Sequence, residues 1–328
     1  MLDLNASYEA IRGTVGVYQR GDAVLRVTGP QRLEYVQCLL AKSVEFVNID
    51  TCVDSVLLDD RAQPVGLAVA LIGPDQIDLV VEATPAWFER ASDLRPSYEV
   101  AVDGSDGLAV QIEGPLSWRV AAELVTDRDI SDVLLHECLA AELDGQTVRL
   151  ARTGATAEYG YLVIASGPAA LEGLAARAAA HGGGPIDPAV LRRVRAEINF
   201  PVLPEQLRGV SLFECGLPWL ATVDRTDPYV GSAALAPEPP VRRTVAAIFP
   251  AADCPPAGCP VLVDGSEVGR LTVWTPRANQ ADGLGLLLLD DPFGVPGLSV
   301  EVAGVAGHTV SRPVIAPLSW SQGIGAGA

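Results

Sequence analysis

The residues best suited to chemistry lie in one short segment, residues 152–161, which read RTGATAEYGY. The segment combines one acid, Glu158, with two aromatic residues, Tyr159 and Tyr161, between glycines. Such a loop can stack a flat heterocycle on an aromatic ring and hydrogen-bond its edge to a carboxylate. The same residues are equally consistent with a hairpin in which Glu158 caps the turn. The sequence therefore predicts either a binding loop or a structural hairpin.

Other common catalytic chemistries have little support. His136, His181 and His308 are isolated in the sequence, and none stands in a metal-ligand spacing or beside an obvious nucleophile. No glycine-rich phosphate-binding motif opens a helix. Cys254 and Cys259, the closest cysteine pair, have too long a spacer for a redox motif. We therefore expect neither a metal site nor a phosphate-binding loop.

Composition and charge narrow the range of partners. The 328 residues include 23 basic and 41 acidic side chains, for a net charge of -18. This charge repels nucleic-acid backbones, and the arginines are scattered rather than clustered. The longest apolar runs are too short to cross a bilayer, and the first residues do not resemble a secretory signal. We expect a cytoplasmic protein with a small-molecule substrate and no nucleic-acid or membrane partner.

The elements that must position residues 152–161 alternate between strands and helices. A strand over residues 21–27 and one over residues 108–112 each run into a Gly-Pro pair and then a helix. Further strands are expected over residues 55–58, 65–72, 77–81, 147–152 and 161–165, and further helices over residues 84–94, 168–180 and 188–197. These strands are too crowded for parallel crossovers, so the pattern favours two similar α+β halves.

The C-terminal part has a different pattern. Residues 236–240, APEPP, form a stiff linker, and five short strands between residues 245 and 302 are joined by glycine turns. This pattern is typical of a small all-β barrel or sandwich. The predicted domains are residues 1–107 with a returning segment 185–235, residues 108–184, the linker 236–240, a barrel over residues 241–320 and a frayed tail 321–328.

Four segments in register resemble the aminomethyltransferase, or glycine-cleavage T-protein, superfamily. Residues 152–161 resemble its R-T-G-Y-T-G-E-x-G-F/Y motif. The other three are IEGP at 112–115, SLFECGLPW at 211–219 and DPYVGSAAL at 227–235, which resemble I-x-G-P, S-P-x-E-A-G-L-x-W and D-F-I-G-R-x-A-L. With the flanking pattern, the resemblance covers residues 11–302. It implies a three-domain α+β fold with two similar halves and a C-terminal β-barrel.

The resemblance also implies a chemistry. Members of the superfamily pass a one-carbon group between a substrate and tetrahydrofolate held in a central channel, without a metal. When the functional residues of the family are matched to this sequence, the resemblance makes Glu158 a candidate catalytic residue. It makes Tyr161, Glu214 and Trp219 candidate cofactor contacts. Tyr159 is added as the second aromatic residue of the segment.

Two departures from the family pattern concern carboxylates. Residues 62–67, AQPVGL, replace the stretch G-G-x-x-D-D-L, whose aspartate acts near the folate. Asp60, just before this stretch, is the candidate substitute, although a solvated turn is the favoured interpretation. Arg195 stands where the family has a pterin-binding glutamate, and a guanidinium cannot accept hydrogen bonds. Glu197 is the candidate shifted acceptor.

Some of these residues have a second interpretation. Arg195 could bind the carboxylate or phosphate of a substrate, or could be a surface arginine. Trp274 could line the cleft, although a tryptophan at strand spacing more often belongs to a core. Ala155 replaces the tyrosine of the loop motif. Together the departures argue against ordinary glycine cleavage.

Three functions follow from these observations. The favoured one is a tetrahydrofolate-dependent methyl, methylene or hydroxymethyl transferase that acts on a small molecule. The second is a paralogue that catalyses a folate-independent step on an anionic specialised metabolite anchored by Arg195. The third is a non-enzymatic folate-binding or partner-binding module. A lipoylated carrier protein, the partner of glycine-cleavage enzymes, is not expected.

Overall fold

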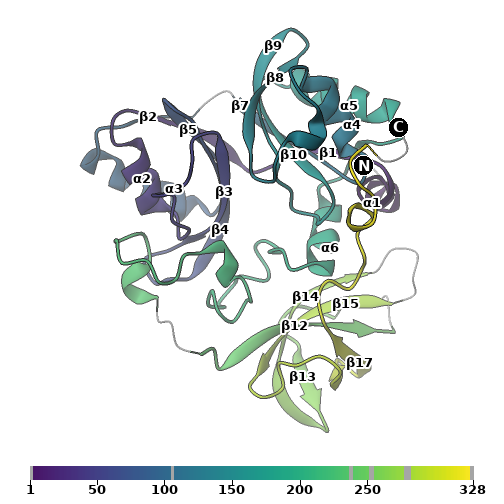
Figure 1. The fold of residues 1–328 in the computed structure, drawn as a ribbon. Coiled ribbons are helices and arrows are strands. Elements are labelled where there is room, and N and C mark those ends of the chain that lie inside the picture. Colours follow the sequence, from purple (N-terminus) through teal and green to yellow (C-terminus); the bar gives the residue numbers. More distant parts are fainter. Residues whose placement is uncertain (1–2, 105–106, 236–238, 251–254, 277–281, 326–328) are drawn as a thin grey trace. The chain divides into compact units, whose positions relative to one another are not determined.

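The structure is a computed structural model that describes residues 3–104, 107–235, 239–250, 255–276 and 282–325. The chain forms two compact units. Figure 1 labels the helices and strands of both. Unit 1 comprises Met1–Asp187, Trp219–Leu235 and Pro317–Ala328, and unit 2 comprises Pro188–Pro218 and Ala236–Ala316. Unit 1 contains two sheets and unit 2 a closed barrel. The predicted division of unit 1 near residue 107 stays a prediction.

The first sheet of unit 1 has five strands in the order β3-β4-β5-β2-β6. Its strands are β2 (Ala23–Thr28), β3 (Thr51–Leu58), β4 (Pro64–Ile72), β5 (Gln76–Ala83) and β6 (Ala101–Gly104). Helices α2 (Arg32–Leu39) and α3 (Pro85–Leu94) contribute Tyr35 and Trp87 to the core of this sheet. The Tyr35 hydroxyl donates to the Ala91 carbonyl, 2.8 Å away, and so ties the two helices together.

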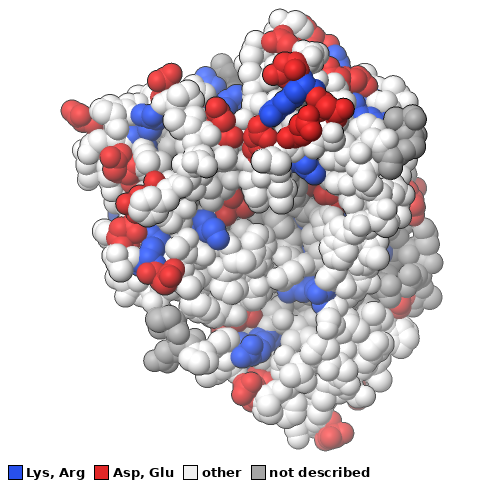
Figure 2. Space-filling view, in the orientation of Figure 1, with Lys and Arg blue, Asp and Glu red and all other residues white. Residues whose placement is uncertain are grey.

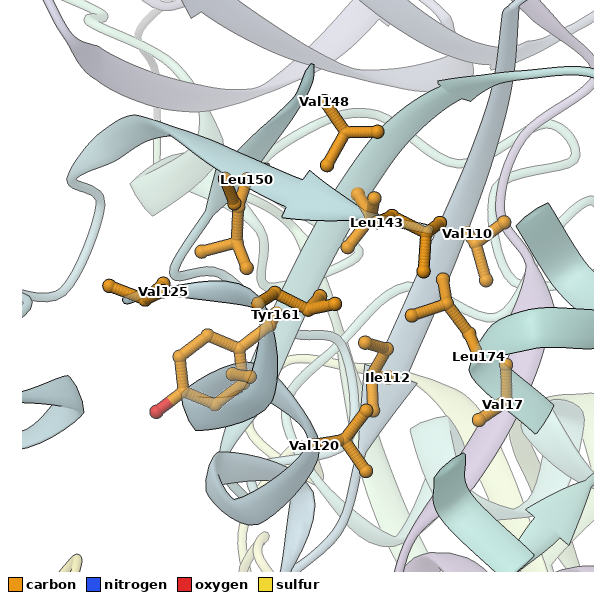
Figure 3. Close-up of a cluster of buried hydrophobic side chains, with 14 of the residues drawn as sticks. Val17, Val110, Ile112, Val120, Val125, Leu143, Val148, Leu150, Tyr161 and Leu174 are labelled. Carbon is orange, nitrogen blue, oxygen red and sulfur yellow. The ribbon is translucent and has the colours of Figure 1, made fainter. Parts of the chain in front are cut away.

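The second sheet has six strands in the order β11-β1-β7-β10-β9-β8. These are β1 (Gly16–Gln19), β7 (Gly107–Glu113), β8 (Cys138–Leu143), β9 (Gln146–Ala151), β10 (Gly160–Ser166) and β11 (Gly184–Pro185). Helices α1 (Leu4–Gly13), α4 (Ser117–Leu124) and α5 (Ala169–Ala180) belong to the same unit. Figure 3 shows the core, in which Ile112 and Tyr161 from the sheet meet Val120 and Leu174 from α4 and α5.

The predicted similarity of the two halves is visible at their Gly-Pro turns. Strand β2 leads through Gly29 into α2, and β7 leads through Gly114 into α4. Both glycines have positive φ, 108° and 138°. A Cβ at Gly29 would lie 2.5 Å from the Glu99 carbonyl oxygen, and one at Gly114 would lie 2.4 Å from that of Thr14. Each turn therefore requires glycine for the same two reasons.

Unit 2 confirms the predicted barrel. Its strands close in the order β12-β15-β14-β13-β16-β17. They are β12 (Arg242–Phe249), β13 (Pro260–Val263), β14 (Ser266–Pro276), β15 (Gly283–Asp290), β16 (Ser299–Val302) and β17 (Val305–Val310). Helix α6 (Ala189–Glu197) packs against β14 and β15. Residues 236–238 of the predicted linker lie outside the described residues.

The C-terminal segment returns to unit 1. A 3-10 turn, Leu318–Trp320, contacts the loop between β9 and β10, and Ile324 packs against the core of the second sheet. The predicted frayed tail began at residue 321, but the Gln322 carbonyl accepts a hydrogen bond from Tyr159. Among the described residues, none of the helices is long and apolar enough to span a membrane.

Candidate functional site

The loop between β9 and β10, residues 152–161, is held by a buried glutamate on β7; we call it the motif loop. Glu113 Oε2 accepts a hydrogen bond from the Tyr18 hydroxyl at 2.8 Å, and Oε1 accepts one from the Ala155 backbone N–H. A Cβ at Gly154 would lie 2.6 Å from Glu113 Oε1. Glu113, which occupies the variable position of the I-x-G-P motif, therefore holds the motif loop in place. Sequence reasoning missed Glu113, although an acid directly before a Gly-Pro turn was the available signal.

Glu158 is buried and binds other parts of unit 1. Its Oε2 accepts hydrogen bonds from the Ser319 backbone N–H at 3.0 Å and from Ser319 Oγ at 2.6 Å. Its Oε1 lies 3.3 Å from the Leu318 backbone nitrogen and 3.4 Å from Arg12 Nη1. Both carboxylate oxygens are thus engaged by the protein. Glu158 resembles a structural acceptor more than a ligand contact.

The two tyrosines of the motif loop point to different surroundings. The Tyr159 backbone N–H donates to Ser319 Oγ at 2.9 Å, and its hydroxyl donates to the Gln322 carbonyl at 2.6 Å. Tyr161 is fully buried in the core of the second sheet (Figure 3). Burial raises the pKa of Tyr161 to about 12. These two rings therefore contact the C-terminal segment and the core respectively.

A buried polar network joins the two sheets of unit 1 beside the motif loop. Asp54 on β3 accepts from Arg20 Nη2 at 3.1 Å and from Thr153 Oγ1 at 3.0 Å. Gln111 on β7 accepts from Arg20 Nη1 at 2.9 Å and donates to the Thr153 carbonyl at 2.7 Å. We call Arg20, Asp54, Gln111 and Thr153 the junction cluster. Burial alone would lower the pKa of Arg20, but the nearby acids, Asp54 foremost, raise it.

A histidine lies against the junction cluster. His136 Nδ1 is 3.9 Å from Asp54 Oδ2 and 3.9 Å from Cys52 Sγ. No pattern in the sequence indicates this contact, because β3 and the start of β8 bring together residues distant in sequence. Asp54 was also missed, although it is the one acid in the otherwise apolar or small-polar strand Thr51–Leu58.

Asp60 lies in the exposed turn between β3 and β4. Its carboxylate is 64% exposed and pairs with Arg90 Nε at 3.0 Å. The preceding Asp59 accepts hydrogen bonds from the backbone of Arg61 and Gln63 at 2.9 and 2.8 Å. This arrangement matches the favoured interpretation of a solvated turn. No ion pair or hydrogen bond among the described residues links Asp60 to Glu158.

Gly66 on β4 belongs to the stretch 62–67 that replaces the family's G-G-x-x-D-D-L. A Cβ at Gly66 would lie 2.5 Å from the Glu82 carbonyl oxygen and 2.7 Å from the Ala83 Cα. Gly66 faces Ala83 in the register of β4 and β5. An aspartate at this position would therefore require a displacement of β5.

Arg195 and Glu197 lie on α6 in unit 2. Arg195 is 5% exposed and its guanidinium carbon lies 5.4 Å from the centre of the Phe200 ring. The alternative of a surface arginine is thus wrong. Glu197 is 1% exposed and accepts from Arg193 Nε at 3.2 Å. Two residues apart on a helix, Arg195 and Glu197 point in nearly opposite directions, so one does not replace the other.

Three further predicted site residues have identifiable contacts. Glu214 accepts from Arg242 Nε at 2.7 Å and from the Ser211 N–H at 2.9 Å. Burial would raise the pKa of Glu214, but these bonds lower it. Trp274 packs inside the barrel against Phe249, 4.9 Å between ring centroids. Trp219, in unit 1, is 43% exposed, and its carbonyl accepts from Lys42 Nζ.

The fourth motif is held in unit 1 by an arginine that sequence reasoning did not single out. Arg225 donates to the carbonyls of Leu40 and Gln37 at 2.8 and 2.9 Å, near the end of α2. It also pairs with Asp227 and lies 4.2 Å from the centre of the Tyr229 ring. The motif aspartate therefore orients a side chain that caps a helix.

Known proteins resemble the chain along most of its length. No family model matches the chain. An aminomethyltransferase of Saccharopolyspora erythraea is 26% identical over 328 residues, covering 95% of this chain and 88% of that protein. One of Listeria monocytogenes is 24% identical over 323 residues, with the same coverage. The crystal structure of the glycine cleavage system aminomethyltransferase T from Bartonella henselae matches 96% of this chain and 90% of its own, with a TM-score of 0.81 and 17% identity.

The chain is thus similar to aminomethyltransferases along 95% of its length. The structural match confirms the expected α+β fold with a C-terminal barrel. Tetrahydrofolate, which the resemblance implies, does not fit two of the candidate carboxylates of this chain. The oxygens of Glu158 are engaged by Arg12 and Ser319, and Asp60 is paired with Arg90 on an exposed turn. Among the described residues, no group of three acids, cysteines or histidines could hold a metal.

Proposed function

We propose that the protein transfers a one-carbon group to or from a small molecule and that this reaction differs from glycine cleavage. The observation that carries the proposal is the likeness to aminomethyltransferases along 95% of the chain. The divergence is supported by the stretch 62–67, which has no acid and in which Gly66 has no room for a side chain, and by Arg195 in place of a glutamate. Glu158 and Asp60 are engaged by protein groups, so the proposal gives neither carboxylate a contact with a folate, and the folate dependence of the transfer is what the assay below tests.

The same proposal holds that the protein does not take its one-carbon group from a lipoylated carrier protein. A strongly acidic protein would need a basic patch to receive an acidic carrier domain. On the face shown in Figure 2, lysines and arginines are scattered among acidic side chains. This distribution supports a diffusible small molecule as the substrate.

The test is an isotope-transfer assay followed by nuclear magnetic resonance (NMR). The full-length protein is incubated with ¹³C-labelled 5-methyl- or 5,10-methylenetetrahydrofolate and a panel of small amines, alcohols and thiols. Enzyme-dependent appearance of the label in an acceptor is the expected result. No transfer to any acceptor, together with no calorimetric binding of either folate, would contradict folate-dependent transfer.

A second candidate function has its own supporting observation. Arg195 is buried beside Phe200, and a buried guanidinium is suited to holding a carboxylate or phosphate. The alternative is a folate-independent step on an anionic metabolite. If Arg195→Glu creates folate binding that the natural protein lacks, this second function is favoured over the first.

A further inference from the structure

The backbone around His136 holds this residue in an uncommon conformation. His136 has a φ of 68°, in the left-handed region that costs a non-glycine residue about 1 kcal/mol. Its N–H donates to the Arg152 carbonyl at 2.8 Å, and its carbonyl accepts from the Cys52 N–H at 2.8 Å. The residue is thus fixed between β3 and the first residue of the motif loop. Conformations of this kind are concentrated at functional sites.

The His136 ring is half exposed and only one of its nitrogens is engaged. Nδ1 faces Asp54 Oδ2 and Cys52 Sγ, each at 3.9 Å, and the side chain is 49% exposed. No other hydrogen bond to the ring is formed by the described residues. Nε2 is therefore the nitrogen that can reach a molecule from solution. Nδ1 and Asp54 Oδ2 are within ion-pair distance but beyond hydrogen-bond distance, so the carboxylate acts on the ring through its charge.

Asp54 is fixed independently of the histidine. Arg20 binds its Oδ1 and Thr153 its Oδ2, so the carboxylate keeps its position beside the ring. The hydrogen bond with Cys52 raises the pKa of His136 most, burial lowers it, Asp54 raises it and Lys42 lowers it, with a net rise. Cys52 stays a thiol, because its contact with Cys138 and its burial raise the pKa of Cys52.

We infer that His136 and Asp54 form a proton-transfer pair in which His136 Nε2 is the general base and Asp54 the positioning residue. The inference rests on the proposed function, because an acceptor nitrogen, oxygen or sulfur must lose a proton as it gains a one-carbon group. In this step the acceptor X–H bond breaks, its electron pair stays on X, and an Nε2–H bond forms. The resulting imidazolium is stabilised by the carboxylate of Asp54. The substrate class is a small amine, alcohol or thiol.

The first test measures the His136 pKa by NMR titration of the imidazole C–H signals of the full-length protein. His136→Asn assigns the signal, since asparagine tolerates the left-handed region. Asp54→Asn should lower the His136 pKa by roughly one pH unit. Thr153→Val should raise it, because Asp54 loses a competing donor. Glu123→Gln is the matched control: it should shift only His181, whose Nε2 lies 2.8 Å from Glu123 Oε1.

The inference is wrong if neither Asp54→Asn nor Thr153→Val moves the His136 pKa. Thr153→Val retains both charges of the Arg20–Asp54 pair, so it decides the question if Asp54→Asn does not fold.

A second measurement tests access to Nε2. Diethyl pyrocarbonate should modify His136, with a rate that rises with pH around the pKa found by NMR. An unmodified His136 in the folded protein would also overturn the inference. Neither experiment needs the substrate. A failed isotope-transfer assay with an intact His136 response would overturn the proposed function, and with it the acceptor assigned to Nε2, while the coupling between His136 and Asp54 would stand.

Discussion

Ser319 Oγ donates a hydrogen bond of 2.6 Å to Oε2 of Glu158, which joins the motif loop to the C-terminal segment of the chain. The Ser319 N–H binds the same oxygen, and the Tyr159 N–H binds the serine hydroxyl. The acid that is the clearest chemical signal in the sequence is thus used to dock a segment 160 residues away. Both oxygens of Glu158 therefore bind groups of the protein itself.

This relationship predicts that Ser319→Ala destabilises the protein. The change removes a hydrogen bond to a buried carboxylate and should lower the free energy of unfolding by about 1.5 kcal/mol. Ser321→Ala is the control, because the Ser321 hydroxyl binds only the exposed Leu318 carbonyl, at 3.1 Å. Urea unfolding followed by circular dichroism measures both. Equal effects of the two substitutions would contradict the docking role of Ser319.

Asp54 on β3 and Asp60 in the turn between β3 and β4 should differ in their importance for stability. Asp54→Asn leaves the buried Arg20 without its closest counter-charge and should cost about 3 kcal/mol. Asp60→Asn breaks an exposed ion pair with Arg90 and should change stability little. The midpoints of thermal unfolding give the comparison. A large loss in Asp60→Asn would indicate that this turn does more than face solvent.

Gly66 should tolerate no side chain. Gly66→Ala places a Cβ 2.5 Å from the Glu82 carbonyl oxygen and should lower the free energy of unfolding by about 1–3 kcal/mol. Gly13→Ala, at the end of α1, meets no atom within 4 Å and should be neutral or slightly stabilising. Chemical denaturation of both variants is the measurement. An unaffected Gly66→Ala would contradict the steric argument against a side chain at this position.

Glu214 should contribute stability that depends on pH. The bonds from Arg242 and Ser211 hold its pKa below the ordinary value of 4.5, so its contribution is full above that value and is lost as the pH falls through the folded-state pKa. Glu214→Gln should lower stability at neutral pH and lose less on acidification than the natural protein. Denaturation curves from neutral pH to about pH 3 measure this. Parallel curves for the two proteins would contradict it.

Much of the fold was predictable because its signals are local. The Gly-Pro turns after β2 and β7, and the short glycine-bounded strands of the barrel, follow from neighbouring residues. The docking of the C-terminal segment was not predictable, because its signal is a contact between Glu158 and Ser319. Strand β17 was also missed, because Val305–Val310 alternates with glycine and histidine and has a weak apolar pattern.

The candidate site was only partly predictable. The motif loop was recognisable from its residue types, and its environment depends on Glu113 from another strand. Asp54 and His136 are 82 residues apart in sequence and meet only because β3 approaches the start of β8. Pairings of this kind follow from the packing of two sheets, which no local pattern encodes.

The most direct test of the central claim compares two reactions of the same protein: transfer from a lipoylated carrier and transfer to a small molecule. The protein is given either an aminomethyl-loaded lipoylated carrier with tetrahydrofolate, or ¹³C-labelled folates with the small-molecule panel, beside an authentic aminomethyltransferase. The account predicts label transfer to a small molecule and no carrier-dependent methylenetetrahydrofolate above the enzyme-free blank. Carrier-dependent activity comparable to that of the authentic enzyme would contradict it.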